Sequence, residues 1–156
     1  MQFILDYWRI MKKQSSYDTT WNGNILVTTV TGTINKDDTN SVLEQVKLMV
    51  QTLKGAPWGN LVDLSQWELG STDVTPSLIE LEDWVRKNGR THLAFVLGTE
   101  YVEIKKFALE KYLGNNLKKN EVILVESLAE GLNWLGKQGF DLKNGNQAES
   151  SFQNQN

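Results

Sequence analysis

Five side chains that could carry chemistry lie in or shortly after one apolar segment of the chain, Asn60-Leu-Val-Asp-Leu64. They are Asp63, Ser65, Ser71, Thr72 and Asp73. A hydroxyl can accept a phosphoryl group, and two carboxylates that reach one substrate can carry out acid–base chemistry. Asp63 lies inside the apolar segment, where an unpaired charge would be costly. We therefore expect its carboxylate to be exposed at the end of a strand or hydrogen-bonded to loop amides.

The common kinds of catalysis find little support in the sequence. The chain has no cysteine, which excludes disulfides, thiolate metal ligands and cysteine nucleophiles. Its single histidine, His92, has no serine or aspartate partner in the pattern, and neither a P-loop nor a dinucleotide glycine fingerprint is present. The net charge of -3 argues against a nucleic-acid partner. We therefore expect a protein that is not an enzyme and uses no metal or cofactor.

Tryptophan is unusually frequent, with 6 among the 156 residues. Trp67 follows the apolar segment, and Trp84 lies in the helix expected after it. Packing in the core explains most such residues. Aromatic side chains also line pockets for apolar molecules and anchor protein partners. Trp67 and Trp84 are therefore candidate binding residues.

Hydrophobic periodicity predicts alternating strands and helices around these residues. Strands are expected at 17–21, 24–34, 60–64, 91–97 and 120–125, and helices at 41–53, 75–88, 99–114 and 127–136. The pair Asn22-Gly23 predicts a hairpin turn, and Ser65 to Asp73 is expected to be a loop. The order ββαβαβαβα predicts one α/β domain with a mostly parallel sheet and an antiparallel N-terminal edge hairpin. Ligands of such sheets bind where strands end and helices begin.

The expected domain spans residues 16–140. Apolar residues recur at helical spacing within residues 1–15, so this N-terminal extension is expected to be helical. A helix packed on the domain, an upstream start codon, an interfacial membrane helix and an arm of a homodimer would each explain it. Residues 141–156 are polar and lack an apolar pattern, which predicts a disordered tail. Because no apolar run is long enough to cross a membrane, we expect a cytoplasmic protein that does not associate with membranes.

The order of elements resembles the STAS fold of anti-sigma-factor antagonists and sulfate-transporter tails, also called SpoIIAA-like. The resemblance covers residues 17–142, and its most specific part is Leu61-Val-Asp-Leu-Ser65. This segment is similar to the third-strand motif of the family, a hydrophobic residue followed by Asp-Leu-Ser. An uncharacterised bacterial branch, Trp-rich and beginning with a hairpin, is similar as well. The resemblance implies a non-enzymatic regulatory module with a protein partner, for example a kinase that is itself an anti-sigma factor.

In that family the loop after the third strand ends in Asp-Ser-Ser-Gly, and one of these serines is phosphorylated. By register, Ser71-Thr-Asp-Val74 takes these positions, so Asp73 stands at the phosphoacceptor position. A slip of one residue places Thr72 there, and Ser71 is a further candidate phosphoacceptor. A fixed negative charge at Asp73 would mimic the phosphorylated state or cap the following helix.

Two functions follow from these observations. The first is a protein-interaction module that presents the loop from Ser65 to Asp73 and the next helix to its partner. The second is a carrier of a small apolar or lipid ligand in a pocket lined by Trp67 and Trp84, and the kinship of the fold with lipid-binding CRAL-TRIO domains favours it. The two functions can be distinguished by the surroundings of the loop after Leu64: a ligand carrier requires a cavity there, and an interaction module requires a flat exposed surface. An enzyme that uses Asp63 and Asp73 is a third, less supported alternative.

Overall fold

The computed structural model describes residues 16–70 and 74–142. The strands are β1 (Ser16–Asn22), β2 (Ile25–Gly32), β3 (Trp58–Trp67), β4 (Arg90–Val96) and β5 (Val122–Val125). The helices are α2 (Lys36–Gln51), α3 (Thr75–Lys87), α4 (Val102–Leu113) and α5 (Leu128–Lys137), with a short 3-10 helix η2 (Gly114–Lys118). This is the predicted order ββαβαβαβα.

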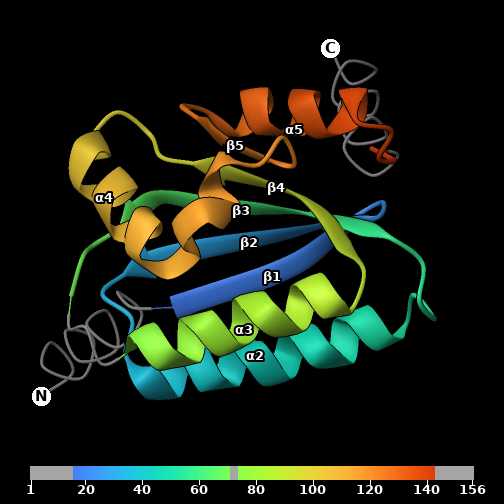
Figure 1. Ribbon diagram of the computed structural model, residues 1–156, viewed down its shortest axis with the longest axis horizontal. Helices are drawn as coiled ribbons and strands as arrows, with labels where there is room; N and C mark the ends of the chain where they lie inside the picture. Colours follow the sequence, from blue (N-terminus) through green and yellow to red (C-terminus); the bar gives the residue numbers. More distant parts are fainter. Residues whose placement is uncertain (1–15, 71–73, 143–156) are drawn as a thin grey trace, which may run out of the picture.

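The strands form one sheet in the order β1-β2-β3-β4-β5. β1 pairs with β2 antiparallel, and all later pairs are parallel. Helices α2 and α3 lie side by side on one face of the sheet, with α4 at their end, whereas α5 covers the other face (Figure 1). β3 is therefore the central strand and carries helices on both sides. The predicted fold class is confirmed.

The hairpin between β1 and β2 turns at Gly23-Asn24, one residue later than predicted. Asn22 and Ile25 are paired across the turn, so Asn22 is the last residue of β1. Gly23 has a φ of 61°, whereas Asn24 is not among the residues with positive φ. A glycine with positive φ at the first central position belongs to a type II′ turn, which suits the twist of a hairpin as well as the expected Asn-Gly turn.

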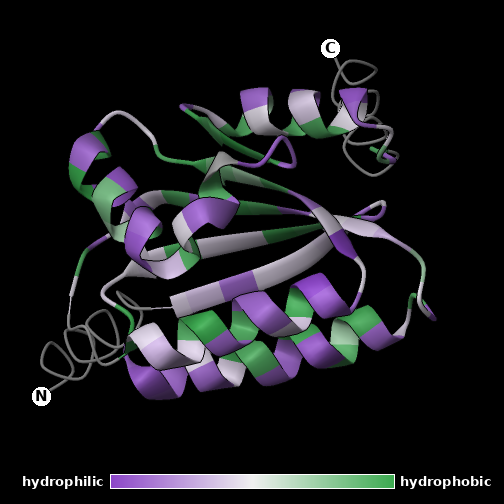
Figure 2. Cartoon of the chain, viewed as in Figure 1, coloured by the Kyte–Doolittle hydropathy of each residue, from purple (hydrophilic) through white to green (hydrophobic). Residues whose placement is uncertain are grey.

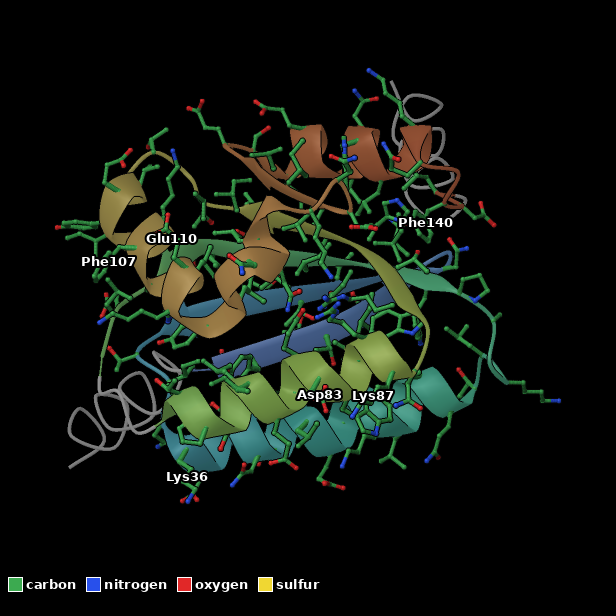
Figure 3. All side chains as sticks on the ribbon, in the orientation of Figure 1. Lys36, Asp83, Lys87, Phe107, Glu110 and Phe140 are labelled. Atoms are coloured by element: carbon green, nitrogen blue, oxygen red, sulfur yellow. The ribbon has the colours of Figure 1, made fainter. Side chains whose placement is uncertain are left out.

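Helices α2 and α3 bury one apolar stripe each and expose polar side chains, so purple and green residues alternate along both (Figure 2). Asn35 caps α2 in a capping box with Asp38, whose N–H donates to Asn35 Oδ1 at 2.8 Å. The first residue of α3 is Thr75, and the cap position before it is Val74. On the outer side of α3, Asp83 and Lys87 form an ion pair at 2.9 Å (Figure 3).

The apolar spacing predicts a stripe of Tyr101, Ile104, Ala108 and Tyr112 on helix α4, and the helix buries only part of it. Tyr101 and Ile104 are exposed, and Phe107 projects from the helix away from the sheet (Figure 3). The buried face carries Ala108 and Leu109, together with residues 105 and 113. Tyr101 has a left-handed φ of 55°, which turns the chain sharply just before the helix.

Helix α5 packs closely on the opposite face of the sheet. Leu135 is buried there with Leu61, whereas Leu128, which helical spacing places on the same apolar stripe, is exposed. Gly131 faces the sheet, and a Cβ on this residue would lie 2.8 Å from Leu61 Cδ1. The absence of a side chain at Gly131 therefore allows α5 to approach β3.

Candidate functional site

The end of β3 determines how the candidate residues are presented. The register with β2 shifts by one residue between Thr29–Asp63 and Thr31–Gln66, which is a β-bulge. Asp63 Oδ1 accepts a hydrogen bond from the Ser65 N–H at 2.9 Å. The expectation that Asp63 bonds a nearby amide is therefore confirmed. Ser65 is exposed and belongs to the strand, not to a loop.

Trp67 is the last residue of β3 and also lies outside the expected loop. It is 8% exposed and packs in the core with Val30, Leu64 and Leu97. Without the bulge, Leu64 and Trp67 would point to opposite faces, because side chains alternate along a regular strand. The bulge turns both toward the face covered by α2, α3 and α4.

A cavity of about 120 Å³ lies between this face of the sheet and helices α2, α3 and α4. Its apolar wall includes Val30, Val62, Trp67, Leu78, Leu81 and Leu109. Protein interiors normally pack as densely as organic crystals, with few voids larger than a water molecule. An apolar void of this size is a candidate binding site for a small molecule.

Two tyrosine hydroxyl groups of the wall have protein partners. The Tyr17 hydroxyl shares a hydrogen bond with Thr39 Oγ1 at 3.3 Å, and burial raises the pKa of Tyr17 to about 12. Burial also raises the pKa of Tyr112, whose hydroxyl bonds the Thr75 side chain. Both phenols are therefore neutral at physiological pH and hold α2 and α3 against their neighbours.

One ion pair closes the side of the cavity near the start of β4. Arg90 binds Glu82 through two hydrogen bonds, at 2.6 and 2.5 Å. The side chains of Arg90 and Glu82 are only 7% and 15% exposed. Both residues line the cavity and also a larger surface hollow between α3 and the starts of β4 and β5. Because the two charges neutralise each other, this wall presents no net charge to a ligand.

Asn60 brings a polar group to the sheet side of the cavity. It lies on β3 between Leu26 and Leu93, which are its partners on the neighbouring strands and are both buried. Its Oδ1 is buried and has no hydrogen-bond partner among the described residues. Such an atom is rare in a folded protein and calls for an explanation.

The chain was compared with known proteins. No family model matches the sequence, and no curated protein matches it. The crystal structure of an uncharacterised protein from the DUF3478 family of Shewanella loihica PV-4, which has a SpoIIAA-like fold, is similar. The similarity covers 77% of this chain and 92% of that one, with a TM-score of 0.54 and 16% sequence identity.

This chain has a SpoIIAA-like fold. The structural similarity confirms the predicted resemblance to STAS and SpoIIAA-like domains at the level of the fold. At 16% sequence identity, this similarity does not extend to function. In this SpoIIAA-like domain the end of β3 borders a cavity through Leu64 and Trp67. That was the feature expected to separate a ligand-binding protein from one with only a flat recognition surface.

The remaining predicted site residues are Ser71, Thr72, Asp73 and Trp84. Ser71, Thr72 and Asp73 lie outside the described residues, so their predicted roles as phosphoacceptor or helix cap stay predictions. Trp84 is half-buried between α2 and α3, with the Lys47 ammonium 5.8 Å from its ring centroid. It does not line the cavity, which therefore has only one of the two expected tryptophans in its wall.

Lys105 is a buried charged residue of this SpoIIAA-like domain that the sequence analysis missed. It is 2% exposed, and its Nζ donates hydrogen bonds to the carbonyl oxygens of Leu97 at 2.8 Å and Ser65 at 3.3 Å. Burial lowers the pKa of its ammonium group, although Glu100 and Asp63 oppose the shift. Lys105 thus ties α4 to the ends of β3 and β4, outside the wall of the cavity.

The described residues offer little for other chemistry. Within residues 16–70 and 74–142, no three His, Cys, Asp or Glu side chains are grouped so that they could hold a metal ion. The same residues contain no helix with the length and apolar character of a membrane span. His92 packs edge-on against Trp134 and Phe140, at 5.7 and 5.3 Å between ring centroids, under helix α5. His92 therefore lies on the face of the sheet opposite the cavity and does not line it.

Proposed function

We propose that this protein is a non-enzymatic binding module that holds a small, largely apolar molecule in the cavity between its sheet and helices α2, α3 and α4. The observation that carries the proposal is the cavity itself, about 120 Å³ in volume and lined mainly by aliphatic and aromatic side chains. A molecule that fills it is stabilised by about 25 cal/mol for each Å² of apolar surface that it removes from water.

The volume limits the size of the ligand. An apolar cavity of about 150 Å³ in another protein accepts benzene, so a molecule of about one aromatic ring suits this one. A phospholipid is far too large unless the helices separate. Of the small apolar and lipid ligands considered from the sequence, only the small ones fit, so the protein would be a carrier or sensor of small molecules.

The experiment uses a variant that fills the cavity and a matched variant that does not. Leu81→Phe adds volume at the wall, and Ile79→Phe adds the same ring on the same helix at a side chain that is 48% exposed. Backbone ¹H–¹⁵N spectra of the full chain are recorded with toluene and with phenol. We expect shifts confined to residues around the cavity in the wild type and Ile79→Phe, and their loss in Leu81→Phe. Absence of specific shifts with either probe in the wild type would overturn the proposal.

A second candidate is the protein-interaction module implied by the STAS resemblance. It is favoured by two exposed apolar side chains on either side of residues 71–73. Leu69, which follows β3, is 40% exposed, and Ile79 on α3 is 48% exposed. An interface needs apolar anchors of this kind. The partner would be a protein that binds the end of β3 and the first turns of α3.

Substitution at this surface tests the second candidate. Ile79→Asp should abolish capture of a specific partner, whereas Leu48→Asp should not, because Leu48 is an equally apolar side chain on α2 with 67% exposure. A partner identified by mass spectrometry must bind the purified wild type and lose affinity only with Ile79→Asp. An equal loss of partner binding with both variants would indicate non-specific hydrophobic association and would exclude this surface as the interface.

A further inference from the structure

Asn60 gives the cavity a chemical preference that its apolar wall alone does not provide. The residue is the third of the central strand β3 and is only partly buried. It is one of the residues that line the cavity. Its side chain therefore lies on the same face of β3 as those of Val62 and Leu64, which also line the cavity, since side chains alternate along a strand.

Besides Thr28 and Asn60, the polar residues of the wall are Tyr17, Tyr112, Glu82 and Arg90, and these four bind protein groups. The Tyr17 hydroxyl bonds Thr39, the Tyr112 hydroxyl bonds Thr75, and Glu82 and Arg90 bind each other. In contrast, Asn60 Oδ1 has no partner among the described residues. A buried carboxamide can satisfy its hydrogen-bonding capacity only with protein, water or ligand.

We propose that the ligand of this cavity is a neutral molecule of about one ring in size that carries a hydroxyl group, and that the Asn60 carboxamide binds this hydroxyl. The inference rests on the proposed ligand-binding function and deepens it. A small phenol or a short alcohol fits this description.

A hydroxyl matches the carboxamide better than other polar groups do. An amide can turn about its terminal bond and present either its carbonyl oxygen or its N–H₂ group, and a hydroxyl both donates and accepts. A carboxylate or ammonium ligand is disfavoured, because the charges of Glu82 and Arg90 neutralise each other and an unpaired charge is expensive in an apolar site. The hydroxyl therefore orients the ligand, while the apolar wall contributes most of the contact.

The position of Asn60 also determines how the ligand is oriented in the cavity. Asn60 belongs to the floor of the cavity on β3, whereas Leu78 and Leu81 come from α3 on the helical side. The hydroxyl end of the ligand must point at the sheet, and its apolar end must point at the helices. A substituent opposite the hydroxyl would thus meet α3 and α4.

The test compares two probes of nearly equal shape, phenol and toluene, which differ by a hydroxyl in place of a methyl group. Dissociation constants are measured by NMR titration for the wild type, Asn60→Leu and Asn60→Val. We expect the wild type to bind phenol at least about fivefold more tightly than toluene, since a site that hydrogen-bonds a ligand discriminates against analogues lacking the group. Both variants should lose this preference, and Asn60→Leu should bind toluene at least as well as phenol.

The outcomes distinguish failure of the inference about Asn60 from failure of the proposed binding function. If the wild type binds both probes in the cavity without a preference, or if both variants retain the preference for phenol, Asn60 is not the anchor and the inference is wrong while the binding function stands. If the wild type binds neither probe, the proposed function fails and the inference fails with it. If either variant does not fold, the other supplies the comparison.

Discussion

Replacement of Asn60 by leucine should make the protein more stable, which is the opposite of what most substitutions in a core do. Asn60 Oδ1 is buried without a partner among the described residues, and such an atom costs about 1–3 kcal/mol. Leucine removes this cost and places methyl groups against the apolar cavity, at about 0.8 kcal/mol for each additional buried methylene equivalent. We expect the free energy of unfolding of Asn60→Leu to rise by roughly 1–3 kcal/mol. For a domain of this size, that corresponds to a melting temperature higher by roughly 3–10 °C.

Guanidinium denaturation followed by tryptophan fluorescence measures the change, with Val62→Leu as the control. Val62 is two residues further along β3 and lines the same cavity, so leucine there adds apolar volume without removing a polar group. The control should change stability by less than about 1.5 kcal/mol. If Asn60→Leu proves less stable than the wild type, the carboxamide has a partner in solution and the reasoning about an orphaned group is refuted. A gain together with lost phenol preference would show that Asn60 lowers stability in order to recognise a ligand.

Three further substitutions test other parts of the structure. Arg90→Met leaves the Glu82 carboxylate buried without its partner and should cost about 3 kcal/mol in urea denaturation; a loss below about 1 kcal/mol would contradict the assigned burial. Gly131→Ala should destabilise by about 1–3 kcal/mol despite the higher helix propensity of alanine, because its Cβ would lie 2.8 Å from Leu61 Cδ1. Adding Leu61→Val should restore part of the loss. The pKa of Tyr17 is raised from 10.0 to about 12, so folding opposes its ionisation, and its stabilising effect is present below pH 10 and lost as the pH rises to 12. Tyr17→Phe should therefore lose less stability than the wild type across this interval, and parallel pH profiles of the two proteins would speak against the shift.

The sequence predicted the fold because the elements are marked by independent local signals. Alternating strands and helices, the glycine at the hairpin and the capping residues before α2 and α5 all agree. At the start of α5, the Ser127 hydroxyl accepts a hydrogen bond from the Glu130 N–H. Where the details were wrong, tertiary contacts had overridden the pattern. In α4 the exposed Ile104 was grouped with the apolar residues, while Lys105 occupies a buried position because two backbone carbonyls at the strand ends bind its ammonium.

The site was predicted less completely than the fold. The segment around Asp63 was correctly predicted to lie near the end of the central strand, whereas Trp67 was wrongly placed in a loop, because no sequence pattern predicts the bulge that turns Trp67 inward. The cavity depends on how far α3 and α4 stand from the sheet, and no local pattern encodes that distance. Asn60 did leave a signal, because an asparagine within an apolar strand must find a partner or a function.

The neighbour-to-neighbour order of the sheet has a consequence for how the protein is made. Every strand after β1 pairs with the strand that precedes it in the chain, so each newly synthesised β-α unit can dock on a strand already in place. All residues that line the cavity fall between Tyr17 and Leu113. All residues of its wall are thus synthesised before β5 and α5, although Val122 and Leu124 of β5 later pack against the core on the same face. A small molecule present during synthesis can be enclosed in the nascent chain before the last helix closes the fold.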